Sequence, residues 1–172
     1  SKRYSLRVRV DGAGDPEPQT IYRAGGSDLF DVRAAASGFH VSVRDASPPK
    51  VAQIVANLES QIPGALVTGG AYSLQIEKEL GTAEALRDKL NTDDAIHGIA
   101  HLRMATESRI DPAHAQPFWG RPNPDIVVSH NGHVTNYDRL RIRYEGLGFS
   151  FASHNDSEII GMLVGEAMET GL

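Results

Sequence analysis

The sequence of 172 residues contains no cysteine, which excludes disulfide bonds, thiolate metal sites and cysteine nucleophiles among these residues. It also contains no apolar run of about 18 residues, the length of a membrane-spanning helix. Acidic residues outnumber basic ones, and the net charge of -5 gives no support for binding to nucleic acid or to an anionic membrane. The first residues lack the apolar segment of a signal peptide, so we expect a cytoplasmic protein.

What is present is an ordinary globular composition, with 40% hydrophobic and 23% charged residues. The length allows one domain with a real core, and we interpret residues 1–172 as a single domain. Predicted strands precede and interleave with predicted helices without a regular βαβ rhythm. That order favours an α+β fold over a doubly wound one.

Hydrophobic periodicity places the elements. Residues 4–10 alternate apolar and polar side chains, as a half-buried strand does. After Ser47, a helix is predicted whose apolar stripe consists of Val51, Ile54, Val55 and Leu58. Further strands are predicted at residues 20–23, 39–43, 65–68, 73–77, 97–103 and 126–128, and further helices at residues 82–90, 137–147 and after a cap at Asn155 or Ser157.

The apolar, β-branched residues 126–128 are followed shortly by Asn131-Gly132, a pair that favours a tight turn. A side-chain amide next to a glycine N–H, at the end of a rigid strand, can direct two donors at one point. That geometry is the one an oxyanion hole requires. A plain hairpin turn is the alternative interpretation of the same pair.

Two charged residues near predicted element ends complete a possible site. The Arg103 guanidinium suits bidentate capture of a carboxylate, and the Asp156 carboxylate suits an ammonium group. Taken alone, each has an ordinary interpretation, as a surface arginine and as a helix cap. Together with the donor pair, they would hold an α-amino acid by its head group and activate a carbonyl on its side chain. Glutamine is the obvious substrate for that arrangement.

Four ordered motifs resemble those of the class II glutamine amidotransferases. Residues 101–106 (His-Leu-Arg-Met-Ala-Thr) are similar to the family's His-x-Arg-[Trp/Met]-Ala-Thr, and residues 113–118 to the loop that follows it. Residues 130–136 (His-Asn-Gly-His-Val-Thr-Asn) and 156–158 (Asp-Ser-Glu) resemble its two later motifs. The order and spacing of these motifs agree with those of the family over roughly residues 97–165.

The resemblance implies the fold of the N-terminal-nucleophile hydrolases, a four-layer αββα sandwich, here incomplete at both ends. It implies hydrolysis of glutamine to glutamate and ammonia. Arg103, helped by Thr106, would bind the substrate carboxylate, and Asp156 its amino group. Asn131 and Gly132 would form the oxyanion hole.

The Arg-Met-Ala-Thr-Glu-Ser variant at residues 103–108 is similar to the branch that serves glutamate-synthase-like assemblies, including N-methylglutamate synthase. The resemblance therefore implies a hetero-oligomer in which a synthase subunit receives the ammonia. No cofactor is expected in this chain, whereas FMN and an iron–sulfur cluster could belong to the partner subunit. The histidines do not fall at the spacing of metal ligands on one helix, so no metal site is predicted.

The sequence departs from the family at its nucleophile, which is a cysteine at the mature N-terminus. Three interpretations stay open. The strand that carries the cysteine is missing from this chain or lies on another polypeptide. Alternatively, the chain is a non-catalytic scaffold with the same fold. In the third interpretation, Ser1 supplies a hydroxyl nucleophile.

Overall fold

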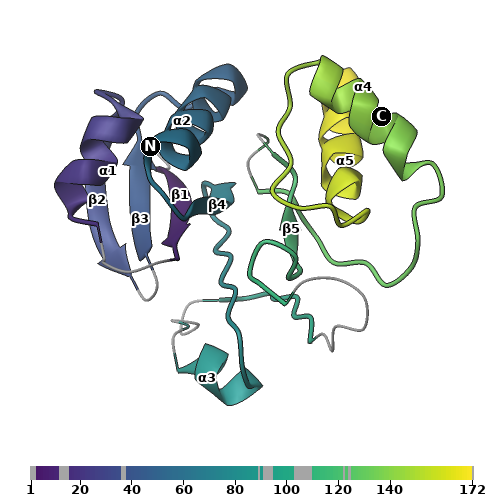
Figure 1. Ribbon diagram of the computed structural model, residues 1–172, viewed down its shortest axis with the longest axis horizontal. Coiled ribbons are helices and arrows are strands. Elements are labelled where there is room, and N and C mark those ends of the chain that lie inside the picture. The colour runs from purple at the N-terminus through teal and green to yellow at the C-terminus, as the bar shows by residue number, and fades with distance from the viewer. Residues whose placement is uncertain are drawn as a thin grey trace.

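The computed structural model describes residues 3–11, 16–35, 38–88, 90, 95–102, 110–121, 123 and 125–171. The chain is a mixed α+β protein with an antiparallel main sheet (Figure 1). In chain order its elements are β1 (Tyr4–Val10), α1 (Pro18–Gly25), β2 (Leu29–Ala35), β3 (Gly38–Val43), α2 (Pro48–Gln61), β4 (Ala65–Ala71), α3 (Ala83–Arg87), β5 (Phe118–Trp119), β6 (Val127–Val128), α4 (Tyr137–Gly146) and α5 (Glu158–Thr170).

The first six elements form a βαββαβ unit. Its four strands lie in the order β2-β3-β1-β4, and every neighbouring pair is antiparallel. Each helical connection therefore passes over one intervening strand, which is the split βαβ arrangement of ferredoxin-like folds. Figure 1 shows α1 and α2 side by side next to this sheet.

Alternation in the central strand β1 explains why the sheet has two different faces. Leu6 and Val8 are fully buried and belong to the main hydrophobic core. The helices meet that core through Ile21 of α1 and through the predicted stripe of α2, Val51, Ile54, Val55 and Leu58, all of which are buried. The predictions for residues 4–10 and for the helix after Ser47 are therefore confirmed.

The opposite face of β1 is charged and is covered by the segment that follows β4. Arg7 Nε lies 2.9 Å from Glu77 Oε1, and Arg9 Nη2 lies 3.8 Å from Glu79 Oε1. Over the described ranges, no second sheet of similar size packs on this face. The antiparallel α+β character is thus confirmed, while the four-layer sandwich is not seen in the part of the chain that the structure describes.

Several predicted elements are wrong, for identifiable reasons. Residues 20–23 lie in helix α1, because Pro18 fits the first helical turn and Ile21 and Ala24 share one buried side. Residues 73–77 form no strand, since the Asp125 carboxylate accepts the backbone N–H groups of residues 72–74. Residues 97–102 belong to no strand either.

The third predicted helix is shorter than expected. Helix α3 covers five residues, capped by Thr82, whose hydroxyl accepts from the Ala85 N–H at 3.3 Å. None of its residues is buried. The segment therefore forms a helix without contributing a side chain to the hydrophobic core.

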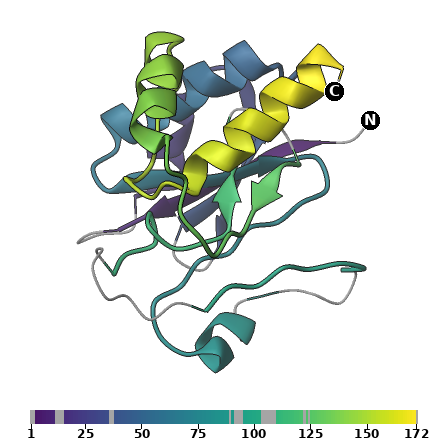
Figure 2. The same ribbon diagram turned by 90° about the vertical axis from the view of Figure 1, so that its right-hand side faces the viewer.

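The C-terminal elements pack against the edge of the βαββαβ unit. Figure 2 shows α5 running beside the short ribbon of β5 and β6. Gly120 and Gly161 allow this approach, because a Cβ on Gly161 would lie 2.7 Å from the Gly120 Cα. Trp119 of β5 joins the main core, whereas Tyr144, Ile159 and Met162 form a second one. Within the described ranges, none of the helices is long and apolar enough to cross a bilayer.

Candidate functional site

Two of the predicted motifs meet at the C-terminal end of β6. The backbone N–H of Val134 donates to Asp156 Oδ2 at 2.6 Å, across 22 positions of sequence. His133 Nδ1 lies 3.3 Å from the same oxygen. The loop that carries Asn131 and Gly132 is thereby joined to the turn that begins α5.

The Asp156 side chain is only 18% exposed, whereas the His133 ring is 80% exposed. Its second oxygen, Oδ1, accepts from Ser157 Oγ at 3.3 Å. A carboxylate has about four lone-pair sites, and these contacts leave some of them unused. Asp156 can therefore accept further hydrogen bonds from an ammonium group on its open side.

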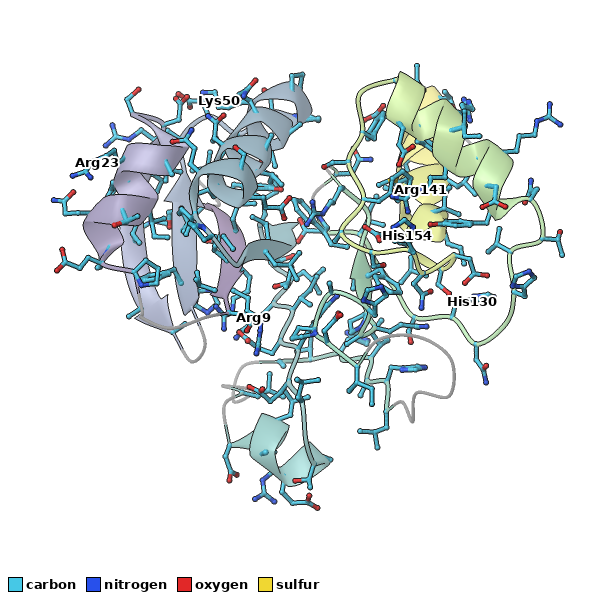
Figure 3. The ribbon with its side chains drawn as sticks, viewed as in Figure 1. Arg9, Arg23, Lys50, His130, Arg141 and His154 are labelled. Carbon is cyan, nitrogen blue, oxygen red and sulfur yellow. The ribbon has the colours of Figure 1, made fainter. Side chains whose placement is uncertain are left out.

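Asn131 and Gly132 lie at the surface, in the loop whose Val134 N–H bonds Asp156. Gly132 rests on the His130 ring, since a Cβ there would lie 2.6 Å from His130 Nε2. The other ring nitrogen, Nδ1, lies 3.0 Å from Ser157 Oγ. Figure 3 shows His130 in the half of the molecule that carries α4 and α5. The imidazole thus packs against the Asn131-Gly132 turn and connects it to the turn before α5.

Gln116 holds the start of this loop. Its role was not among the predicted ones. Its Oε1 accepts from the His130 N–H at 2.6 Å and from Ser129 Oγ at 3.0 Å. Its Nε2 donates to the His130 carbonyl oxygen at 2.8 Å. No periodic pattern marks this residue; the only signal was its place in the motif that precedes β5.

Glu158 holds the other side of the site and was also missed. Its side chain is nearly fully buried, with 1% exposed. The carboxylate accepts from the Ala152 and Ser153 N–H groups at 2.7 and 3.0 Å, and from Ser153 Oγ at 2.8 Å. These bonds fix the loop before Asp156 and so fix where α5 begins.

A cavity of about 500 Å³ adjoins this region. It is lined in part by Gln116 and Leu102, and by the charged or titratable side chains Lys78, His101, Asp111 and His114. Burial lowers the pKa of the Lys78 amine to about 8, an effect that the nearby Glu158 carboxylate partly opposes. Its Nζ lies 4.9 Å from the centre of the Phe118 ring. In the part of the chain that the structure describes, no three His, Asp or Glu side chains are grouped to hold a metal ion.

Arg103 and Thr106 lie outside the described residues. The structure joins the loop of Asn131 and Gly132 to Asp156 through Val134, and the roles of all five residues stay predictions.

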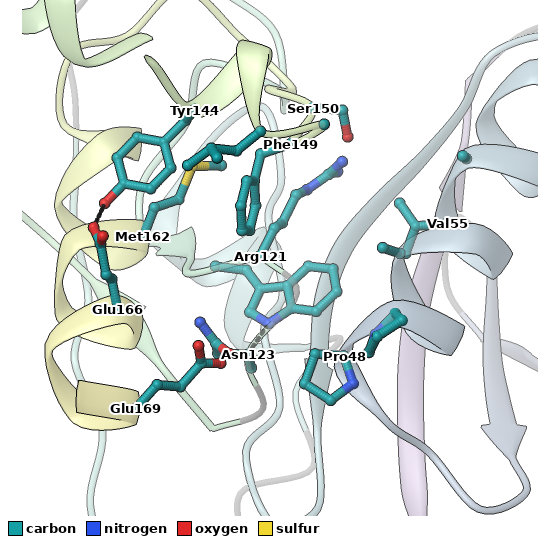
Figure 4. Close-up of a pocket in the computed structure, with 16 residues that line it drawn as sticks. Pro48, Val55, Arg121, Asn123, Tyr144, Phe149, Ser150, Met162, Glu166 and Glu169 are labelled. Carbon is teal, nitrogen blue, oxygen red and sulfur yellow. Dashed lines mark hydrogen bonds between the residues drawn. The ribbon is translucent and has the colours of Figure 1, made fainter. Parts of the chain in front are cut away.

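A second cavity of about 500 Å³ lies away from these residues, between α2 and the α4–α5 pair (Figure 4). We call it the inter-helix cavity, and its walls include Pro48, Val55, Trp119, Phe149 and Met162. Several of its polar groups are already engaged. Glu166 bonds Tyr144 and Arg143, Arg121 bonds Glu59, and Trp119 Nε1 donates to the Asn123 carbonyl oxygen. We therefore do not place the chemistry there.

Comparison with known proteins supports the resemblance to the glutamine amidotransferases. Residues 101–171, which include both motifs of the site, match the family model described as a glutamine amidotransferase domain. Over these residues the chain is similar to the glutamine amidotransferases. The amidotransferase match begins after the βαββαβ unit. No solved structure matches the chain.

Individual relatives extend the comparison. A protein of Methanothermobacter thermautotrophicus, named as a glutamine amidotransferase, is 36% identical over 64% of this chain and 37% of its own length. The glutamine amidotransferase-like protein GlxB of Rhizobium meliloti is 30% identical over 81% of this chain and 46% of its own. Glutamine–fructose-6-phosphate aminotransferase of Idiomarina loihiensis is 33% identical over 62% and 18%. The chain spans less than half the length of these relatives.

Proposed function

We propose that this chain is the glutaminase part of a class II glutamine amidotransferase, which hydrolyses glutamine to glutamate and ammonia. The observation that carries the proposal is the bond from the Val134 N–H to Asp156, at 2.6 Å. It joins the loop of a candidate oxyanion hole to a candidate ammonium ligand. The match of residues 101–171 to the amidotransferase family supports the same conclusion.

Each predicted residue has a role in this reaction. Arg103 and Thr106 bind the α-carboxylate of glutamine, and Asp156 binds its α-ammonium group. A thiolate attacks the side-chain carbonyl carbon, and the Asn131 amide and the Gly132 N–H stabilise the oxyanion that forms. The C–N bond then breaks, ammonia leaves with a proton, and water hydrolyses the thioester to glutamate. Because the 172 residues contain no cysteine, the proposal takes the thiolate from outside them.

The wider assembly is proposed on the sequence motif alone. The variant at residues 103–108 favours a synthase of the N-methylglutamate type as the acceptor of ammonia. In that assembly, FMN and an iron–sulfur cluster belong to the partner subunit, and the complete glutaminase adopts the four-layer αββα sandwich. The alternative is a scaffold domain that binds a partner and hydrolyses nothing.

The test is ammonia release from L-glutamine by the natural protein that contains these residues. Replacing Arg103 with alanine should raise KM by about 30- to 1,000-fold, because a charged bidentate contact is worth about 2–4 kcal/mol. Arg139→Ala removes an exposed arginine of α4 and serves as the matched control. An unchanged KM for Arg103→Ala would show that its role is wrong. Absence of ammonia release by the wild type would favour the scaffold.

A further inference from the structure

We infer that Gln116 is the positioning residue of the oxyanion hole: its carboxamide fixes the His130 backbone and thereby directs the Asn131 amide and the Gly132 N–H. This inference rests on the proposed function and deepens it. Gln116 does not contact the substrate in this account. It acts through the loop that carries the two donors.

The hydrogen bonds of Gln116 have the pattern of a neighbouring strand. One side chain accepts from the His130 N–H at 2.6 Å and donates to the His130 carbonyl oxygen at 2.8 Å. Both polar groups of one backbone residue are thus satisfied together, and both peptide planes that flank His130 are held. The second of these planes leads directly into Asn131.

The register of the small sheet explains why a side chain takes this place. Phe118 pairs with Val128, and Trp119 with Val127, in an antiparallel ladder. Two residues further along the same register, Gln116 stands opposite His130. The backbone ladder ends with the pair of Phe118 and Val128. The Gln116 carboxamide supplies the donor and the acceptor that the main chain lacks there.

The loop also needs such support. Strand β6 ends at Val128, and Asn131 and Gly132 lie at the surface beyond it. Oxyanion donors act only if they are held in place before the reaction, because the charge develops at one fixed position. On the side opposite Gln116, the His130 ring packs under Gly132 and lies 3.0 Å from Ser157 Oγ. His130 is therefore held through both its backbone and its ring.

The experiment compares Gln116→Leu and Gln116→Glu in the natural protein. Leucine keeps the bulk of the side chain and removes all three hydrogen bonds. Glutamate keeps acceptors for the His130 N–H and for Ser129, but it places a carboxylate oxygen against the His130 carbonyl oxygen. Gln53→Leu, at an exposed position of α2, is the matched control.

We expect Gln116→Leu to lower kcat for glutamine by about 10- to 100-fold, with KM within about threefold of wild type. Amide hydrogen exchange at His130 should accelerate by about tenfold or more, while amides of β1 and β3 keep their rates. Gln116→Glu should also lower kcat, but it should retain protection of the His130 amide. The control should change neither quantity.

Two results would overturn the inference and can be told apart. If the wild type releases ammonia and both folded variants keep its kcat, or change only KM, Gln116 does not position the oxyanion hole. If Gln116→Leu does not fold, Gln116→Glu decides the question alone. If the wild type releases no ammonia, the proposed function fails as well, and exchange at His130 then reports only a structural contact.

Discussion

Replacing Asn131 with alanine should lower kcat for glutamine hydrolysis by about 100- to 1,000-fold, with little change in KM. Removal of one oxyanion-hole donor has an effect of this size, because the lost hydrogen bond forms mainly in the transition state. Asn131 lies at the surface of the loop that is bonded to Asp156 through Val134. Among the described residues, its side-chain amide has no partner of its own, so it is available to a ligand.

The measurement is steady-state ammonia release by the natural protein, with Asn57→Ala, outside the buried stripe of α2, as the control. A kcat within about threefold of wild type would remove Asn131 from the oxyanion hole. The double variant with Gln116→Leu adds a further comparison. If Gln116 acts through Asn131, the two losses in kcat should fall well short of additive.

Replacing Arg121 with methionine should lower the free energy of unfolding by about 3 kcal/mol, since it removes the guanidinium partner of the Glu59 carboxylate, which is 23% exposed and keeps only its bond from the Val67 N–H. The Arg121 guanidinium binds both Glu59 oxygens, at 2.7 and 3.1 Å, and the Val67 carbonyl oxygen at 2.5 Å. Its side chain is 6% exposed. The contact joins α2 and β4 of the βαββαβ unit to the segment after β5.

Urea unfolding followed by circular dichroism measures this loss. Glu59→Gln in the same chain should recover part of the stability of Arg121→Met, because the unpaired carboxylate is then removed. Arg139→Met, on the exposed side of α4, should leave the unfolding midpoint unchanged. A loss below about 1 kcal/mol for Arg121→Met would show that the contact behaves as a surface ion pair.

Periodicity predicted those parts of the fold in which one face is buried. The alternation of β1 and the stripe of α2 were sufficient, because burial repeats with the period of the element. It failed at α1, where the β-branched residues at 20 and 21 favoured a strand although Pro18 begins a helix. With α1 misassigned and β2 not predicted, the βαββαβ order could not be recognised.

The candidate site could be predicted only in part, and for a related reason. Short motifs contained Asn131, Gly132 and Asp156, and the structure joins the segments that carry them through the bond from Val134 to Asp156. Gln116 and Glu158 act through side-chain bonds to backbone groups, which depend on the register between segments rather than on any period. The contact between Arg121 and Glu59 likewise joins residues 62 positions apart.

The central claim is that one molecule of glutamine binds at the site formed by the loop of residues 130–134 and Asp156. Amide chemical shifts recorded during titration of the natural protein with L-glutamine test it most directly. We predict saturable shifts at Gly132, Val134 and the residues around Asp156, and none at Ala52 or Phe149 of the inter-helix cavity. Shifts confined to that cavity, or an unchanged loop at saturating glutamine, would contradict the account.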